Sequence, residues 1–318
     1  MLENSLDTTK RQTICITGAS GFLGSSAVRK FASKGYRVIA LTRPTSKSLH
    51  SVANDQVKQV RGTIDDWVSV IKAEKPTTVL SFDWSGVERE LRADQSLQEA
   101  NIERVCKLAE AATSVEARNF MALGSQAETK PSFLPILETA LDEPQSEYGA
   151  AKIATREKIQ AILAGTTTRF LWGRIFTVYG PGDTRDSFIT GLIRKLSLSE
   201  NYEISEPSKK WSFLEVSDFA EALYLLHGDD RISGVVNIGN PDSSTIGEVA
   251  DFIGESLGKS EYIKKLTFAD PNPTDSAWIP DTKTLNRLLW KPIVPLNLGL
   301  QNTVRWWERK AILDGYNS

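Results

Sequence analysis

Tyr148 and Lys152 are the two residues whose types and spacing point most directly to chemistry. They stand four residues apart in the sequence Tyr-Gly-Ala-Ala-Lys, which places both side chains on one face of a helix. An ammonium close to a phenol favours the phenolate, so it is expected to lower the pKa of Tyr148 toward neutral pH. Such a phenol can act as the acid or base of an alcohol–ketone interconversion. The spacing also fits a surface tyrosine beside a solvated lysine, and that alternative stays open.

Ser125 is the second candidate, because it follows a predicted strand over residues 119–123. The residue after a parallel strand lies at the carboxyl edge of the sheet, where ligands bind in folds of this class. A hydroxyl there can hydrogen-bond an oxygen of the substrate. The alternative is a serine in an ordinary turn between a strand and a loop.

Three glycines in the stretch 17–24 predict where a cofactor would bind. Gly18, Gly21 and Gly24 follow a β-branched run over residues 13–17 and open a helical pattern over residues 22–34. Gly18 permits a tight turn, Gly21 lets the backbone approach a pyrophosphate, and Gly24 lets the helix pack on the strand. The pyrophosphate would lie at the positive end of that helix. The spacing differs from the usual G-x-G-x-x-G fingerprint, so the flanking strand and helix carry the prediction.

These residues need a framework that positions them, and the rest of the first half predicts one. Hydrophobic patterns predict further strands and long helices, over residues 37–42, 59–61, 78–81 and 168–176 for strands and 94–112 and 148–164 for helices. Alternating strands and helices are typical of an α/β fold, here a Rossmann-type doubly wound parallel sheet.

After residue 182 the alternation weakens, and the later part is predicted to form a smaller C-terminal α/β substrate lid. Its predicted elements are helices over 186–198, 216–226, 246–257 and around 304–313, a strand over 235–238 and a polar loop over 200–210. Ser217 or Asp218 is expected to cap the helix over 216–226. Residues 1–178 with 212–240 would bind the dinucleotide, and residues 179–211 with 241–318 would bind the substrate.

Composition excludes several classes of function. A formal net charge of −2 over 318 residues offers no surface for a polyanion, so nucleic acid is not an expected partner. No apolar run approaches the roughly 20 residues that span a bilayer, so no membrane contact is expected, and the polar residues 1–12 are interpreted as a loose tail of a cytoplasmic protein. Cys15 and Cys106 are expected to be inert core residues. His50 and His227 are expected at the surface, and no metal site is predicted.

In combination these motifs resemble the extended short-chain dehydrogenase/reductases, the NAD-dependent epimerase/dehydratase family of nucleotide-sugar enzymes. The resemblance covers nearly the whole chain and is carried by residues 17–24, Asn101, Ser125, Tyr148-x-x-x-Lys152, 174–182, 211–220 and 289–292. It implies that Tyr148 exchanges a proton with the sugar oxygen, that Lys152 holds the nicotinamide ribose, and that Ser125 steadies the developing oxyanion. The family often dimerises through its two long helices, so a homodimer is expected.

The resemblance also implies the binding residues. Cofactor contacts are expected from Gly18, Ser20, Gly21, Phe22, Leu23, Gly24, Thr42, Arg43, Ile64, Phe82, Asn101, Ile175 and Val178. Substrate contacts are expected from Trp84, Gln126, Thr177, Arg185 and Trp211. Asp83 and Trp84 stand where relatives often carry small residues, so they would reshape the nicotinamide pocket, although Trp84 can equally serve a structural role. Packing within the lid is the alternative for Trp211.

Thr42 and Arg43 indicate which cofactor binds. An NAD enzyme usually has an acid at the end of the second strand, where it holds the ribose 2′-hydroxyl. This chain has Thr42 and then Arg43, whose guanidinium suits a 2′-phosphate. NADP(H) is therefore favoured, with NAD(H) still possible. The alternative is that Arg43 is only a solvated charge at the end of a strand.

The residues after Ser125 narrow the reaction. Dehydratases of the family carry an Asp-Glu pair there, whereas this chain has Gln126 and Ala127, which cannot act as acid or base. Ser125-Gln-Ala-Glu128 instead resembles the subgroup of CDP-abequose and CDP-paratose synthases. The resulting hypothesis is NADPH-dependent reduction of the 4-keto group of a nucleotide-linked 4-keto-6-deoxy sugar. A 4-epimerase that retains NAD and a non-catalytic dinucleotide sensor are the alternatives. One departure weakens the sugar-nucleotide interpretation, since epimerases often carry arginines at the positions of Trp211 and near Asn272.

Overall fold

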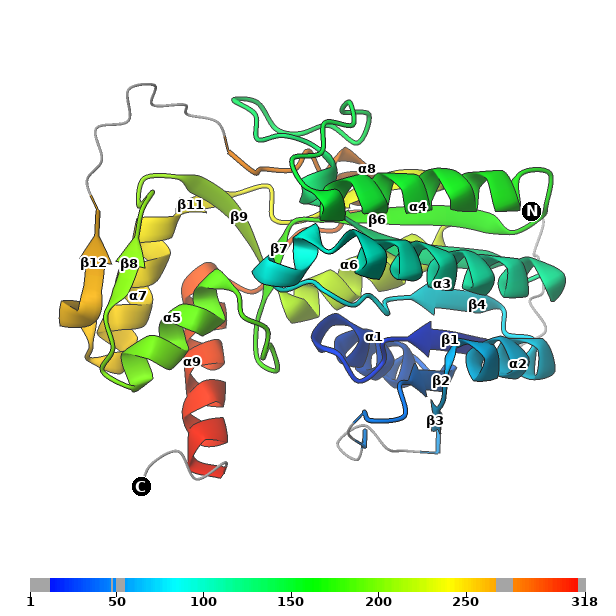
Figure 1. The fold of residues 1–318 in the computed structure, drawn as a ribbon, viewed down its shortest axis with the longest axis horizontal. Coiled ribbons are helices and arrows are strands. Elements are labelled where there is room, and N and C mark those ends of the chain that lie inside the picture. Colours follow the sequence, from blue (N-terminus) through cyan, green and yellow to red (C-terminus); the bar gives the residue numbers. More distant parts are fainter. Residues whose placement is uncertain (1–11, 47, 50–54, 267–276, 314–318) are drawn as a thin grey trace.

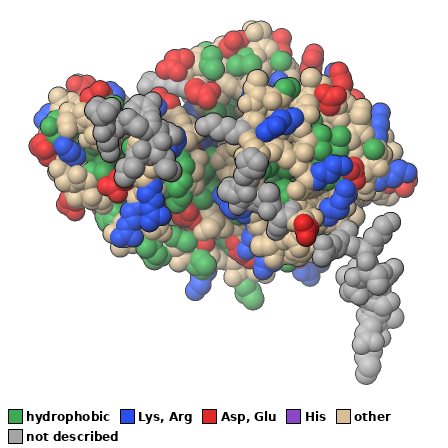
Figure 2. Space-filling model, turned by 90° about the horizontal axis from the view of Figure 1, so that it is seen from below, with side chains coloured by type: hydrophobic (Ala, Val, Ile, Leu, Met, Phe, Trp, Pro, Cys, Tyr) green, Lys and Arg blue, Asp and Glu red, His purple; other side chains and the backbone are tan. Residues whose placement is uncertain are grey.

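The structure is a computed structural model that describes residues 12–46, 48–49, 55–266 and 277–313. His50 and Asn272 lie outside these residues. Within them, no helix combines the length and hydrophobicity needed to cross a bilayer. Figure 2 shows acidic and basic side chains interspersed over the described part of one face.

A parallel sheet organises the larger part of the molecule (Figure 1). Its strand order is β10-β6-β5-β4-β1-β2-β3, and every neighbouring pair is parallel. The strands are β1 Thr13–Thr17, β2 Arg37–Thr42, β3 Val57–Arg61, β4 Thr78–Ser81, β5 Asn119–Ser125, β6 Arg169–Ile175 and β10 Gly234–Ile238. The chain reverses its direction of winding between β1 and β4, which is the switch point where open α/β sheets bind ligands. The predicted Rossmann-type fold is confirmed.

Helices cover both faces of this sheet, as Figure 1 shows. They are α1 Phe22–Ser33 and α6 Val216–Gly228 on one face, and α2 Ile64–Glu74, α3 Gln95–Ser114 and α4 Glu147–Leu163 on the other. Successive residues of a strand point to opposite faces. Ile14 and Ile16 of β1 accordingly enter the core under α1 and α6, whereas Cys15 enters the core under α2, α3 and α4. Burial on both faces explains why the inner strands are mostly apolar, whereas the edge strand β3, Val-Lys-Gln-Val-Arg, has no buried residue.

The remaining elements gather mainly in a smaller region with its own core, at the left of Figure 1. One sheet there has the order β11-β9-β7 and a second pairs β12 with β8. The strands are β7 Thr177–Tyr179, β8 Tyr202–Ile204, β9 Lys210–Glu215, β11 Ser243–Thr245 and β12 Ile263–Lys265. The helices are α5 Phe188–Ser197, α7 Ile246–Leu257 and α9 Leu296–Leu313, with the 3-10 turn η3 Ser260–Tyr262 beside α7. The short helix α8 Lys283–Arg287 lies beside β10 of the main sheet. Two further 3-10 turns are η1 Arg89–Ala93 and η2 Gln126–Glu128.

Two predictions about this part of the chain need correction. The predicted loop over 200–210 contains β8 and the start of β9, because these polar segments gain strand structure only by pairing with distant residues. The cap of α6 is Glu215, whose carboxylate accepts the N–H of Ser217 at 2.6 Å. The predicted domain boundaries at 178 and 211 fall inside the β7–β9–β11 sheet, and the division itself stays a prediction.

His227 is buried rather than at the surface as predicted. Its side chain lies in the last turn of α6, only 5% exposed, because α6 packs onto the sheet through to its end. Nε2 lies 2.9 Å from the hydroxyl of Thr78, and the ring meets the edges of Phe31 and Tyr36. Burial lowers the pKa of His227 to about 4. Cys15 is buried as expected, with its pKa raised to about 12 by burial, whereas Cys106 is only half-buried.

Candidate active site

The glycine stretch forms a turn that only glycine fits. Gly18 has a φ of +62°, and a Cβ there would lie 2.8 Å from the carbonyl carbon of Phe82. A Cβ on Gly24 would lie 2.1 Å from the carbonyl oxygen of Gly18. Gly21 precedes α1 without any side-chain cap, so the N–H groups of the first turn face outward at the positive end of a helix. These features fit a dinucleotide pyrophosphate.

Other predicted cofactor residues are either exposed at this turn or packed on the cores of the main sheet. Ser20 and Gly21 are exposed, whereas Phe22 and Leu23 pack on the core below. Phe82 lies against Phe219 of α6, with ring centres 6.5 Å apart. The apolar residues that complete the set pack on the two cores of the main sheet, namely Ile64, Ile175 and Val178.

Thr42 and Arg43 at the end of β2 have definite partners. The buried hydroxyl of Thr42 accepts a hydrogen bond from Gln59 at 3.1 Å. Nε and Nη2 of Arg43 lie 2.9 Å and 2.7 Å from Oδ1 of Asp83. Arg43 is therefore fixed in an ion pair at the sheet edge, although 45% of its side chain stays exposed.

Asn101 holds the segment that follows β4. Its Oδ1 accepts the N–H of Ser85 at 3.0 Å, and its Nδ2 donates to the carbonyl of the same residue at 2.8 Å. Arg104 also donates to this Oδ1, at 2.9 Å, and to Asp83 at 3.1 Å. Since the side chain of Asn101 is fully buried, its effect on a cofactor would pass through the 82–85 segment.

The three predicted catalytic residues come from two neighbouring elements. Ser125 ends β5, and Tyr148 and Lys152 lie one turn apart in α4. The ammonium of Lys152 is almost fully buried and donates to the carbonyl of Leu123 at 2.9 Å. It lies 5.6 Å from the centre of the Tyr148 ring. The phenol of Tyr148 interacts with the Ser125 hydroxyl. The structure therefore brings all three residues together.

Trp84 covers the lysine. Its ring centre lies 3.5 Å from Nζ of Lys152, and the ring meets Tyr148 edge-on at 6.0 Å. Its Nε1 donates to Gln98 of α3 at 3.0 Å. Trp84 therefore forms one wall of the site and supplies a cation–π contact to the lysine.

Burial shifts the pKa of both predicted catalytic groups. It lowers the pKa of Lys152 to about 7, and the charge of Glu128 opposes that shift. Burial also raises the pKa of Tyr148, against the opposing effects of Arg92 and the Ser125 hydroxyl. The guanidinium of Arg92 lies 5.4 Å from the Tyr148 ring centre. The net shift of Tyr148 is opposite to the one predicted from its spacing to Lys152, because burial outweighs the nearby cations. A phenol with a raised pKa is protonated at neutral pH.

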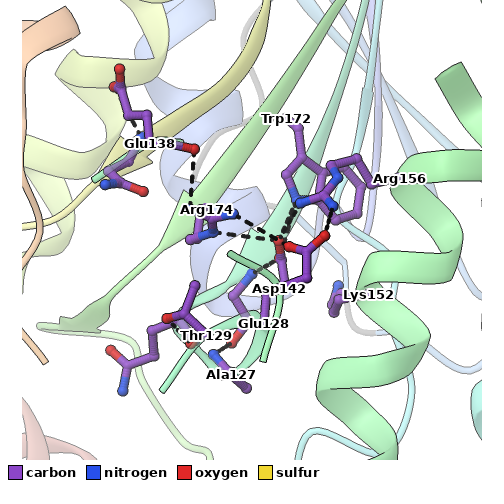
Figure 3. A network of polar contacts seen from close by, with 12 residues as sticks. Ala127, Glu128, Thr129, Glu138, Asp142, Lys152, Arg156, Trp172 and Arg174 are labelled. Atoms are coloured by element: carbon purple, nitrogen blue, oxygen red, sulfur yellow. Dashed lines mark hydrogen bonds and ion pairs between the residues drawn. The ribbon is translucent and has the colours of Figure 1, made fainter. Parts of the chain in front are cut away.

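A buried carboxylate fixes Ser125, and Figure 3 shows it between two arginines and a tryptophan. Glu128 is fully buried, and one of its oxygens accepts the N–H of Ser125 at 2.6 Å. It also accepts from Trp172 at 3.1 Å, Arg156 at 3.2 Å and Arg174 at 3.4 Å. The Ser125 hydroxyl in turn accepts the N–H of Ala127, which completes a capping box around η2.

Arg156 and Arg174 connect the buried Glu128 carboxylate to the loop that leads to α4. Arg156 donates to Asp142 at 2.5 Å, and Arg174 donates to the carbonyls of Leu137 and Glu138 at 3.4 Å. Sequence reasoning assigned Glu128 no role, although the spacing Ser125-x-x-Glu128 is that of a capping box. The network links β5, β6, α4 and the loop into one support for the serine (Figure 3).

The remaining predicted substrate residues differ in their surroundings. Oε1 of Gln126 is buried and has no hydrogen-bond partner among the described residues. Arg185 pairs with Asp183 at 2.7 Å and lies 4.9 Å from the Phe22 ring centre, which brings it to the glycine turn. Thr177 begins β7 and is half-buried. Trp211 packs beside Phe213 in the smaller core, with ring centres 6.4 Å apart, so the structure does not join it to the Ser125 cluster.

Comparison with known proteins agrees with this geometry. UDP-glucuronic acid decarboxylase 1 of Arabidopsis thaliana is 27% identical over 95% of this chain and 71% of its own length. GDP-L-fucose synthase 1 of Arabidopsis thaliana is 26% identical over 95% of each chain. The structure of MoeE5 in complex with UDP-glucuronic acid and NAD has a TM-score of 0.82 at 25% identity, and covers 94% of this chain and 99% of that one. The model of the NAD dependent epimerase/dehydratase family matches residues 14–239, and the chain belongs to that family.

Proposed function

We propose that the chain reduces the 4-keto group of a nucleotide-linked 4-keto-6-deoxy sugar with NADPH. The observation that carries this proposal is the cluster in which Tyr148 and Lys152 share one face of α4, with Ser125 at the end of β5 and Trp84 over the lysine. Reduction of a ketone requires a proton donor at the carbonyl oxygen, and a phenol with a raised pKa is a donor at neutral pH. The nicotinamide, when bound, supplies the hydride.

The protein's own residues then have separate tasks. Tyr148 gives its proton to the oxygen as that oxygen gains negative charge, and Ser125 donates a hydrogen bond to the same oxygen. Lys152 holds the cofactor ribose and supports the phenolate that forms. Glu128 keeps the serine in place through its backbone N–H. Trp84 shields the lysine from water on the side of its ring.

The residues after Ser125 support reduction over dehydration. Gln126 and Ala127 carry no carboxylate, so neither can remove a proton and return it across a sugar ring. The carboxylate of Glu128, next in the sequence, is buried beneath the serine and saturated by Arg156, Arg174 and Trp172. It is therefore not available to a substrate.

Relatives support a nucleotide-linked sugar as the substrate. The names of the two plant relatives refer to UDP-glucuronic acid and to GDP-L-fucose, and MoeE5 was solved with UDP-glucuronic acid. We extend this class of ligand to the present chain. We assign Arg185, which lies beside the glycine turn, as a cation that contacts this substrate.

A 4-epimerase with retained NAD is the second candidate, and the NAD in the MoeE5 complex favours it. The two functions differ in cofactor turnover, since an epimerase returns its hydride to the sugar and consumes none. A dinucleotide sensor is a third possibility, but it would have no use for the assembled Ser125, Tyr148 and Lys152.

A panel of nucleotide-linked 4-keto-6-deoxy sugars tests the proposal. Each is mixed with NADPH, and the nicotinamide absorbance is followed. Stoichiometric loss of absorbance with formation of the 4-hydroxy sugar is the expected result. Interconversion of 4-epimers without net loss, together with NAD that copurifies with the protein, would replace the reductase by the epimerase.

A further inference from the structure

A buried carboxylate joins two arginines at the edge of the glycine turn. The side chain of Asp83 is only 4% exposed. Its Oδ1 lies 2.7 Å from Nη2 of Arg43, and its Oδ2 lies 3.1 Å from Nη1 of Arg104. Two guanidinium charges and one carboxylate charge leave this cluster with one net positive charge. An anion is the kind of ligand that such a cluster attracts.

The Arg43–Asp83 pair crosses the place where a dinucleotide would bind. Arg43 follows β2 and Asp83 follows β4, with β1 between these two strands in the sheet. The turn at Gly18 follows β1, and a Cβ on Gly18 would lie 2.9 Å from the amide nitrogen of Asp83. The ion pair therefore spans the carboxyl end of β1, beside the turn that fits the pyrophosphate.

Arg104 makes this pair able to open. A buried carboxylate without a counter-ion is strongly destabilised, so Asp83 could not release a sole partner. When Arg43 turns away, Asp83 still has its ion pair with Arg104. Arg104 is held in place by its hydrogen bond to Asn101 at 2.9 Å. Arg43 is half-exposed and its side chain is long. A phosphate dianion also binds a guanidinium more strongly than a carboxylate does.

We propose that Arg43 exchanges Asp83 for the 2′-phosphate of NADP(H), and that Asp83 and Arg104 set the affinity of this exchange. The inference rests on the proposed function for its choice of NADP(H). Asp83 competes with the phosphate for Arg43, and Arg104 weakens that competition by neutralising Asp83. The uncharged 2′-hydroxyl of NAD(H) leaves the Arg43–Asp83 pair closed.

Titration calorimetry with half-cofactors isolates this step and needs no sugar. 2′,5′-ADP and 5′-AMP differ only in the 2′-phosphate. Asp83→Asn is expected to tighten 2′,5′-ADP by about threefold to tenfold, because the competing charge is gone. Arg104→Gln is expected to weaken 2′,5′-ADP by a similar factor, since Asp83 then depends on Arg43 alone. The double variant is expected to bind 2′,5′-ADP at least as tightly as the wild type.

Lys107→Gln is the matched control. Lys107 lies on the same helix and pairs at the surface with Asp65, at 3.6 Å. In this variant, as in the others, 5′-AMP binding should stay at the wild-type value. Thermal unfolding of each variant checks the fold. Should Asp83→Asn not fold, Arg104→Gln keeps the test decisive.

Weaker binding of 2′,5′-ADP by Asp83→Asn would overturn the exchange, as would an equal loss of both ligands in Arg104→Gln. Arg43→Gln separates the exchange from the choice of cofactor. If Arg43→Gln loses the preference for 2′,5′-ADP while the Asp83 and Arg104 variants leave it unchanged, the exchange is rejected and NADP(H) stands as the cofactor. A wild-type chain without that preference would reject both, while the roles of Ser125 and Tyr148 would stand.

Discussion

Glu128→Gln is the substitution whose cost follows most directly from the structure. Glutamine keeps the shape of the side chain but removes the charge that Arg156 and Arg174 share in a fully buried place. Removal of one partner from a buried ion pair costs about 3–5 kcal/mol. Asp142 stays as a counter-ion for Arg156 at 2.5 Å, which offsets part of that cost. We expect a loss of about 2–4 kcal/mol in the free energy of unfolding.

The same variant should also lower activity, because the N–H of Ser125 loses a charged acceptor at 2.6 Å. Chemical denaturation measures stability, and the absorbance assay with NADPH measures kcat. Glu143→Gln is the matched control, since Glu143 pairs with Lys130 at the surface at 2.7 Å. Its loss should stay within about 0.5 kcal/mol. If Glu128→Gln were as stable and as active as the control, Glu128 would not be the support of Ser125.

Three further predictions concern the cofactor, acid stability and assembly. Arg43→Asp should shift the preference from NADPH toward NADH by about tenfold or more, since a charged hydrogen bond is lost and a repulsion gained; an unchanged ratio of the two kcat/KM values would contradict the phosphate contact. His227 has a folded pKa of about 4, below its ordinary 6.5. Its neutral form therefore contributes about 3 kcal/mol to the free energy of unfolding above pH 6.5, and this contribution is lost as the pH falls from 6.5 through 4. In His227→Gln the free energy of unfolding, measured between pH 4 and 7, should fall less steeply as the pH is lowered. An unchanged pH dependence would assign the acid sensitivity to other groups. A homodimer through α3 and α4, which pack side by side, should appear in light scattering, and a monomer at working concentration would refute it.

Local sequence patterns were sufficient to predict the parts of the fold that repeat a simple rule. Apolar runs predicted the inner strands of the parallel sheet, because both faces of those strands are covered. The glycines at 18 and 24 predicted the turn, because Gly18 has a positive φ and a Cβ on Gly24 would meet the carbonyl oxygen of Gly18, six residues earlier. The spacing of Tyr148 and Lys152 predicted their shared helical face in the same way.

Long-range contacts account for what the sequence did not reveal. Arg156 and Arg174 reach Glu128 from 28 and 46 residues away, so no local pattern marks the buried ion network. The burial of His227 depends on Thr78, 149 residues earlier. β8 and β12 are three-residue strands in polar sequence that exist by pairing with each other. The pKa of Tyr148 was predicted in the wrong direction, because spacing showed the nearby cation and not the burial.

The central claim is that the phenol of Tyr148 delivers the proton while the nicotinamide delivers the hydride. Tyr148→Phe removes the proton donor and keeps the ring between Trp84 and Arg92. The most direct measurement is single-turnover oxidation of NADPH, at saturating nucleotide-linked 4-keto-6-deoxy sugar, alongside calorimetric binding of NADPH. The expected result is a rate lower by about 10²–10⁴-fold with unchanged NADPH affinity. A Tyr148→Phe variant that oxidises NADPH at the wild-type rate would contradict the claim.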